Sequence, residues 1–161
     1  AKVARLAAHS FDITEYIVAI ARDEGLAEGM GTLEGGVTLH MACHARAQNI
    51  GNKAADMLKL VPNAEIEVIE RCSGHGGSIG VTRDFHEIAL KVGKPTARRA
   101  LEKGSHFIAS ECPLAASHIV AGMELLAAES KEHKDDASAL PKVTRAYHPI
   151  ELFARAYELG K

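Results

Sequence analysis

Tryptophan is absent from this 161-residue chain and aromatic residues make up only 4% of it, so aliphatic side chains must build the core. No apolar run approaches the ~18 residues of a membrane-spanning helix, and we expect no transmembrane segment. The formal net charge of −2 gives no indication of nucleic acid or an anionic membrane surface as a partner. Residues 1–14 lack the apolar segment of a signal peptide, so we expect a cytoplasmic protein.

Cysteine is also scarce. The chain has three cysteines, an odd number that argues against a disulfide framework. The length and the 47% hydrophobic content suit one packed domain over residues 1–161. Because the chain starts without methionine, we expect it to be a fragment of a longer protein.

Three short segments have the apolar, β-branched composition of buried strands and are bounded by turn residues: 36–42, 65–71 and 105–111. Helical patterns lie around them, at 11–25, 45–62, 81–93, 94–104, 113–129 and 148–160, with a charged loop expected at 129–142. Asp12 is the expected N-cap of the first helix, and Gly93 is the expected end of the third. Strands that alternate with helices predict an α/β fold with a mostly parallel sheet flanked by helices.

The cysteines share one topological position. Cys43, Cys72 and Cys112 each follow a predicted strand by one residue or fewer, and each precedes a helix or a glycine turn. In a parallel sheet the carboxyl ends of the strands lie at one edge, which is where open α/β sheets bind ligands. We therefore expect three thiols at the C-terminal ends of successive strands to converge.

Three converging thiolates suit an iron–sulfur cluster or a zinc ion, both of which normally take four protein ligands. His44 and His75 are the candidates for the fourth ligand. Three glycines let the backbone approach a cofactor and aim N–H groups at it: Gly74, Gly76 and Gly77.

Two readings without a cofactor stay open for these cysteines. Cysteines can act as redox thiols without a metal, and a single cysteine after a strand is more often a small buried hydrophobic residue than a ligand. We expect His40, within a strand, and His118, near the start of a helix, to be ordinary structural residues.

Three motifs carry a resemblance to a known family. The segments "CHARAQNIG", "ERCSGHGGSIG" and "SECPLAASHI" resemble the cysteine-rich CCG domain found in heterodisulfide reductase and its relatives. They are most similar to the C-terminal domain of the iron–sulfur, membrane-anchoring component of anaerobic glycerol-3-phosphate dehydrogenase and similar iron–sulfur oxidoreductases. The resemblance runs from about residue 11 to residue 123, and residues 148–159 also resemble the C-terminal segment of that group.

The resemblance assigns Cys43 to the family's first cysteine, Cys72 to the first of the CC pair and Cys112 to the first of the closing C-x-x-C. The second position of the pair is Ser73 and the last position is Ala115, so the five cysteines of a noncubane double cluster are incomplete. What the resemblance implies is three thiolates fit for one cubane [4Fe–4S] cluster with a non-cysteine or open fourth position, or for zinc.

The function implied by the resemblance is electron transfer. The domain would relay electrons from a flavin-containing dehydrogenase subunit, or another redox partner, towards a quinone or other acceptor. It would reach the inner face of the membrane through that complex. We expect an oxidoreductase subunit rather than a self-contained enzyme, because no acid–base pair is evident in the sequence. The alternatives are a zinc-binding or metal-free domain that docks partner subunits, and thiol–disulfide exchange by two of the cysteines.

Overall fold

The computed structural model describes residues 2–49, 51–132, 143 and 145–159. Within them four strands form one sheet in the order β2–β1–β3–β4, and every neighbouring pair is parallel. The strands are β1 (Val37–His40), β2 (Ile66–Ile69), β3 (Phe107–Ser110) and β4 (Ala146–Tyr147). The predicted α/β fold with a parallel sheet is confirmed, and β1, β2 and β3 lie within the three predicted strand segments.

The central strand is buried along its whole length. All four residues of β1 are buried, and Leu39 pairs with Val68 on one side and Ala109 on the other. A parallel strand covered on both faces takes a continuous buried run instead of an alternating pattern. The burial of β1 agrees with its position between β2 and β3. Because these three strands are adjacent and parallel, the segments that follow them start from neighbouring positions.

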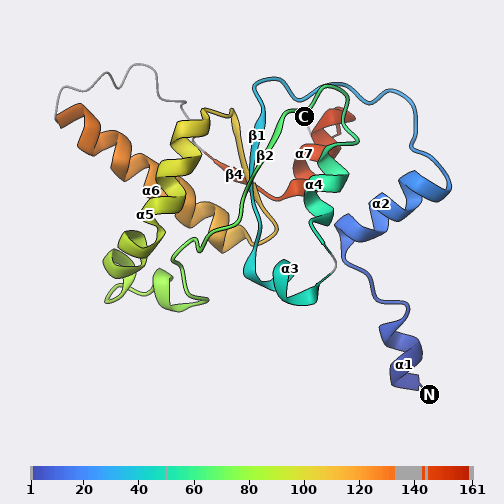
Figure 1. Cartoon of the computed structure of the whole chain (residues 1–161), viewed down its shortest axis with the longest axis horizontal. Coiled ribbons are helices and arrows are strands. Elements are labelled where there is room, and N and C mark those ends of the chain that lie inside the picture. The colour runs from blue at the N-terminus through green and yellow to red at the C-terminus, as the bar shows by residue number, and fades with distance from the viewer. Residues whose placement is uncertain (1, 50, 133–142, 144, 160–161) are drawn as a thin grey trace.

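Helices cover both faces of the sheet (Figure 1). On one face α5 (His86–Lys103) packs with α6 (Pro113–Glu132), and their side chains share a core with Ile69 and Ile108. On the other face α2 (Ile13–Asp23), α4 (Lys53–Leu58) and α7 (Pro149–Ala156) enclose a second core around Val37 and Leu39. The short helix α3 (Cys43–Gln48) lies at the carboxyl edge of the sheet, and α1 (Lys2–Ala7) extends from the body with no buried residue.

Two helix predictions are wrong. Residues 81–104 do not form two helices, because α5 runs unbroken through Gly93 and Pro95. Gly93 lets the backbone of the loop after β2 lie directly against α5, because a Cβ at this position would be 2.3 Å from the carbonyl oxygen of Ser73. Residues 45–62 do not form one helix, because Asn49 (φ 54°) and Gly51 (φ 82°) adopt left-handed backbone conformations that separate α3 from α4.

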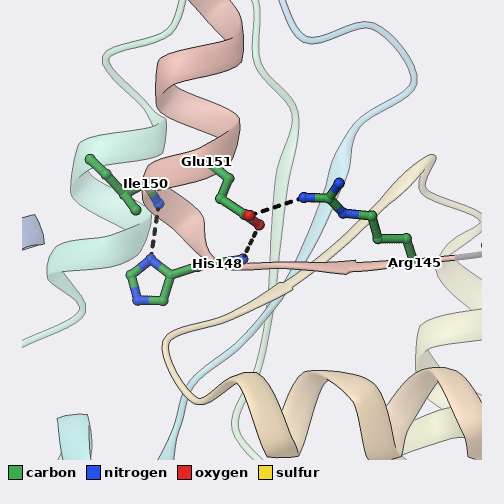
Figure 2. A network of polar contacts seen from close by, with 4 residues as sticks. All are labelled: Arg145, His148, Ile150 and Glu151. Carbon is green, nitrogen blue, oxygen red and sulfur yellow. Dashed lines mark hydrogen bonds and ion pairs between the residues drawn. The ribbon is translucent and has the colours of Figure 1, made fainter. Parts of the chain in front are cut away.

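The last helix begins as predicted, at a proline that follows a polar cap. Figure 2 shows the network that starts α7. The Nδ1 atom of His148 accepts the Ile150 N–H at 3.3 Å, and the carboxylate of Glu151 accepts the His148 N–H at 3.0 Å. Arg145 donates to the other oxygen of Glu151 at 2.9 Å. This reciprocal capping anchors α7 directly after β4.

Asp12 caps α2 as predicted, because its side chain accepts a hydrogen bond from the Thr14 N–H. The sequence did not predict α1 or the two-residue strand β4. The helix predicted at 113–129 continues to Glu132, and the rest of the charged loop, 133–142, lies outside the described residues. The last helix was expected to run to Gly160, but α7 ends at Ala156, with Tyr157 as its C-cap. Within the described part of the chain, no helix combines the length and the apolar character that crossing a membrane requires.

Candidate metal centre at the carboxyl edge of the sheet

The three cysteines lie where three neighbouring strands end. Cys43 is the first residue of α3 after β1, Cys72 lies in the loop after β2, and Cys112 lies between β3 and α6. Because β2, β1 and β3 are adjacent and parallel, these segments leave the same edge of the sheet, the lower edge in Figure 1. The predicted position of the cysteines at the carboxyl ends of three neighbouring strands is therefore confirmed, while their convergence on one cofactor stays a prediction. All three are free thiols; Cys43 and Cys72 are exposed and Cys112 is half-buried.

A buried histidine ties these three strand ends together. The imidazole of His40 lies 2.8 Å from the carbonyl oxygen of Arg71 through Nε2 and 3.0 Å from Oγ of Ser110 through Nδ1. A carbonyl only accepts, so Nε2 carries the proton, and a neutral His40 accepts from the Ser110 hydroxyl. Burial lowers the pKa of His40, with nearby His75 acting in the same direction, and so favours this neutral form. Ser110 Oγ in turn accepts the N–H of Cys112 at 3.3 Å.

The loop after β2 is held against α5 by close backbone contacts. The hydroxyl of Thr96 donates to the carbonyl oxygen of Cys72 at 2.6 Å. A Cβ on Gly74, which has φ +88°, would lie 2.2 Å from the Ala89 carbonyl oxygen, so only glycine fits there. The Gly74 N–H points at Sγ of Cys72 at 3.4 Å. The glycine-rich sequence predicts backbone N–H groups that point at a bound cofactor. Here one such N–H donates to the sulfur of a cysteine instead.

The other two glycines of the loop differ from Gly74. Gly76 and Gly77 have φ of +55° and +67°, and a Cβ on Gly77 would meet nothing within 4 Å. Their conformations keep the loop tightly turned, and the space beside Gly77 leaves the backbone accessible. A role for these two glycines in binding a cofactor stays a prediction.

One candidate histidine contacts a cysteine. Nε2 of His75 lies 3.8 Å from Sγ of Cys112, and its Nδ1 lies 2.8 Å from Oγ of Ser73, which is only 2% exposed. Burial, and then the nearby His118, lowers the pKa of His75. The neutral imidazole that this favours is the form that binds metals. Ser73 therefore holds His75 with one ring nitrogen turned to the Cys112 thiol.

The other candidate, His44, lies in a different group of charges. It is exposed on α3. Burial lowers the pKa of His148, and His44 acts weakly in the same direction, so His44 lies near His148. Glu111, directly before Cys112, is buried, and its pKa rises to about 6 because of burial and the nearby Asp12, although the Ala42 N–H stabilises its charged form. That hydrogen bond connects the turn before Cys43 with the turn before Cys112. In the described part of the chain, His75 is the candidate histidine with a cysteine contact.

The spacing of the possible metal ligands bears on whether they could bind a single metal ion or a cluster. Among the described residues, no three His, Cys, Asp or Glu side chains converge closely enough to coordinate one metal ion. Tetrahedral zinc needs its ligands within about 2.3 Å of one point. A multi-iron cluster spreads its cysteine ligands over several irons and so accepts sulfurs that lie farther apart. Soft thiols, a neutral imidazole and a backbone N–H that donates to a cysteine sulfur fit such a cluster.

Sequence reasoning missed two residues near this site. Ser73 occupies the position that the resemblance assigns to the second cysteine of the CC pair, and this position was the signal that its side chain faces the site. His118 was expected to be an ordinary residue on a helix face, but it is buried at 6% exposure and its Nε2 has no hydrogen-bond partner among the described residues. Nothing in the helical pattern of α6 marks that nitrogen.

Comparison with known proteins gives a family and an iron–sulfur relative. The chain is 32% identical over 101 residues to an uncharacterized iron–sulfur protein of Methanocaldococcus jannaschii, a match that covers 62% of this chain. The chain spans about a fifth of the length of that relative, since the match covers 20% of it. No solved structure matches the chain. The model of a cysteine-rich domain family, CCG, matches residues 37–119, which is more than half of the chain and includes all three cysteines. The chain therefore belongs to the CCG cysteine-rich domain family.

Proposed function

We propose that this domain is an iron–sulfur electron-transfer module whose cluster is bound by Cys43, Cys72 and Cys112. The observation that carries the proposal is the position of the three free thiols at the ends of adjacent parallel strands. The matched relative is named an iron–sulfur protein, which supports the same class of cofactor. A bound [4Fe–4S] cluster would supply reversible electron transfer.

The protein's own part is to position the ligands. His40 and Ser110 fix the segments that carry Cys72 and Cys112, while α5 holds the loop through Thr96. The Gly74 N–H, already turned to the Cys72 sulfur, stabilises negative charge on that thiolate. Two exposed cysteines leave the site open to a partner, which suits electron exchange at the protein surface.

His75 is the fourth ligand in this proposal. A histidine that binds a metal through one ring nitrogen usually donates a hydrogen bond from the other, which fixes its tautomer. Nδ1 of His75 would donate to Ser73 Oγ, and Nε2 would be free to bind on the side of Cys112. The Ser73–His75 pair would thus replace the second cysteine of the family's CC pair.

The electron donor and acceptor are the finer part of the proposal. A flavin-containing dehydrogenase subunit would deliver electrons, and a quinone or other acceptor at the inner face of the membrane would receive them. The sequence resemblance to the iron–sulfur, membrane-anchoring component of anaerobic glycerol-3-phosphate dehydrogenase supports this assignment. The cytoplasmic location and the membrane association of the complex belong to the same proposal.

The test is metal and acid-labile sulfide analysis, with an absorption spectrum, on anaerobically purified chain and on Cys72→Ser. We expect about four irons and four sulfides per chain and broad absorption near ~400 nm, both lost in Cys72→Ser. Zinc in a colourless protein would replace the proposal with a structural metal site. Full folding without metal, together with a reversible disulfide, would replace it with thiol–disulfide exchange.

A further inference from the structure

A buried histidine nitrogen lacks a hydrogen-bond partner within the described part of the chain. His118 on α6 is 6% exposed, and its Nε2 has no hydrogen bond to the described residues. Leaving a buried polar group without a hydrogen bond costs about 1–3 kcal/mol. Such an atom in a folded protein calls for an explanation, and an absent ligand is one.

The position of His118 connects it with the candidate metal centre. The Cδ2 atom of its ring, which is bonded to Nε2, lies 3.4 Å from the place where Gly93 would carry a Cβ. At the same place the Ser73 carbonyl oxygen lies 2.3 Å away. The ring therefore lies where the loop of Cys72 crosses α5.

The neighbours of His118 enclose it without using its Nε2. His86 stacks edge-on against its ring at a centroid distance of 5.8 Å. The Nδ1 atom of His86 donates to the carbonyl oxygen of Gly80 at 2.8 Å, so this nitrogen has a partner of its own. The ring lies between His86 and Gly93, with its unpartnered Nε2 buried beside the loop that carries Cys72.

We infer that His118 belongs to the cofactor site and that its Nε2–H donates a hydrogen bond to a sulfur of the bound iron–sulfur group. The inference rests on the proposed function, since it requires a sulfur-containing cofactor at this edge of the sheet. A donor aimed at such a sulfur stabilises the more negatively charged reduced form and so raises the reduction potential. His118 would thus be a positioning and tuning residue, in addition to the ligands.

The experiment compares His118→Leu with His118→Gln and His106→Leu, each as the full chain with and without its cofactor. Leucine removes the unpaired nitrogen but fills similar space, and glutamine keeps a donor. His106 is an exposed histidine directly before β3, at the opposite edge of the sheet, and serves as the matched control. The measurements are the midpoint potential by anaerobic redox titration, the rate of iron loss to a chelator, and the unfolding midpoint of the cofactor-free chain.

We expect His118→Leu to leave the cofactor-free chain as stable as the wild type or more stable, because a buried unpaired polar atom is gone. In the loaded protein it shifts the midpoint potential to more negative values and speeds iron loss several-fold. His118→Gln shifts the midpoint potential less than His118→Leu does, and His106→Leu changes neither the midpoint potential nor the rate of iron loss. A wild-type chain that binds its cluster, with an unchanged potential and unchanged iron loss in His118→Leu, overturns this inference alone. A wild-type chain without iron and sulfide overturns the proposed function itself.

Discussion

His75 and Cys112 are 37 positions apart in the chain, yet Nε2 of one lies 3.8 Å from Sγ of the other. The contact crosses from the loop after β2 to the turn after β3, so the central strand β1 separates the two segments within the sheet. It forms because Ser73 holds the far side of the imidazole and because the loop backbone lies directly on α5. The geometry therefore brings a soft thiol and a neutral imidazole together at the edge where the cysteines lie.

The choice of fourth ligand gives the first prediction. Replacing His75 with alanine should reduce the retained iron, because the cluster loses a ligand and is exposed to solvent. His75→Cys should retain iron, since a thiolate at this position is a good iron ligand. His44→Ala is the matched control and should retain iron, because His44 lies near His148. Iron and sulfide analysis after anaerobic gel filtration measures all three; loss in His44→Ala with retention in His75→Ala would reverse the assignment.

The loop glycines give the second prediction. Gly74→Ala should destabilise the chain by about 3 kcal/mol or more, because its Cβ would overlap the backbone of α5 and its φ is positive. Gly77→Ala has a similar φ but open space, so it should cost only about 1–2 kcal/mol of conformational strain. Urea unfolding of the cofactor-free chain gives both values. Equal losses for the two variants would show that the contact with α5 is not tight.

The cap of α2 gives a prediction that depends on pH. Asp12 accepts hydrogen bonds from the N–H and the hydroxyl of Thr14, at 2.8 and 2.6 Å. Burial alone would raise the pKa of Asp12, but the hydrogen bonds from Thr14 outweigh it and hold the pKa below the ordinary 3.8. Because the folded-state pKa is depressed, the stabilisation is complete above that ordinary value. It is lost as the pH falls through the lower folded-state pKa.

We therefore expect Asp12→Ala to cost about 1 kcal/mol at neutral pH and progressively less under acidic conditions below the ordinary pKa. Asp12→Asn keeps a capping oxygen that does not titrate, so its cap should persist into acid. Denaturant unfolding of the three proteins at a series of pH values measures the differences. A difference between wild type and Asp12→Ala that stays constant down to the lowest pH would contradict this role of the carboxylate.

The sequence predicts the three main strands and the shared position of the cysteines because each strand is a short buried run with a clear boundary. Gly93 misled the helix prediction: the sequence pattern does not distinguish a glycine that ends a helix from one that lets a loop backbone approach it. The strand β4 has only two residues, too few for any periodic signal. The burial of His118 could not be predicted, because it depends on α5 packing against α6 and on the loop after β2.

The candidate site is predictable in its ligand types but not in its contacts. The cysteine and glycine segments lie at one edge of the sheet because of the strand topology, which local sequence patterns specify well. The pairing of Ser73 with His75, and the separation of His44 from it, depends on side-chain directions within tight turns. Sequence periodicity carries no information about these directions.

The most direct test of the central claim is an anaerobic redox titration of the loaded chain that counts electrons while the absorption of the cofactor is followed. We expect reversible uptake of about one electron per chain, with bleaching of the iron–sulfur absorption, in the wild type and none in Cys72→Ser. Uptake of about two electrons by a colourless chain, with two thiols appearing, would contradict it in favour of a disulfide. No electron uptake by a folded, metal-loaded chain would likewise remove the electron-transfer function.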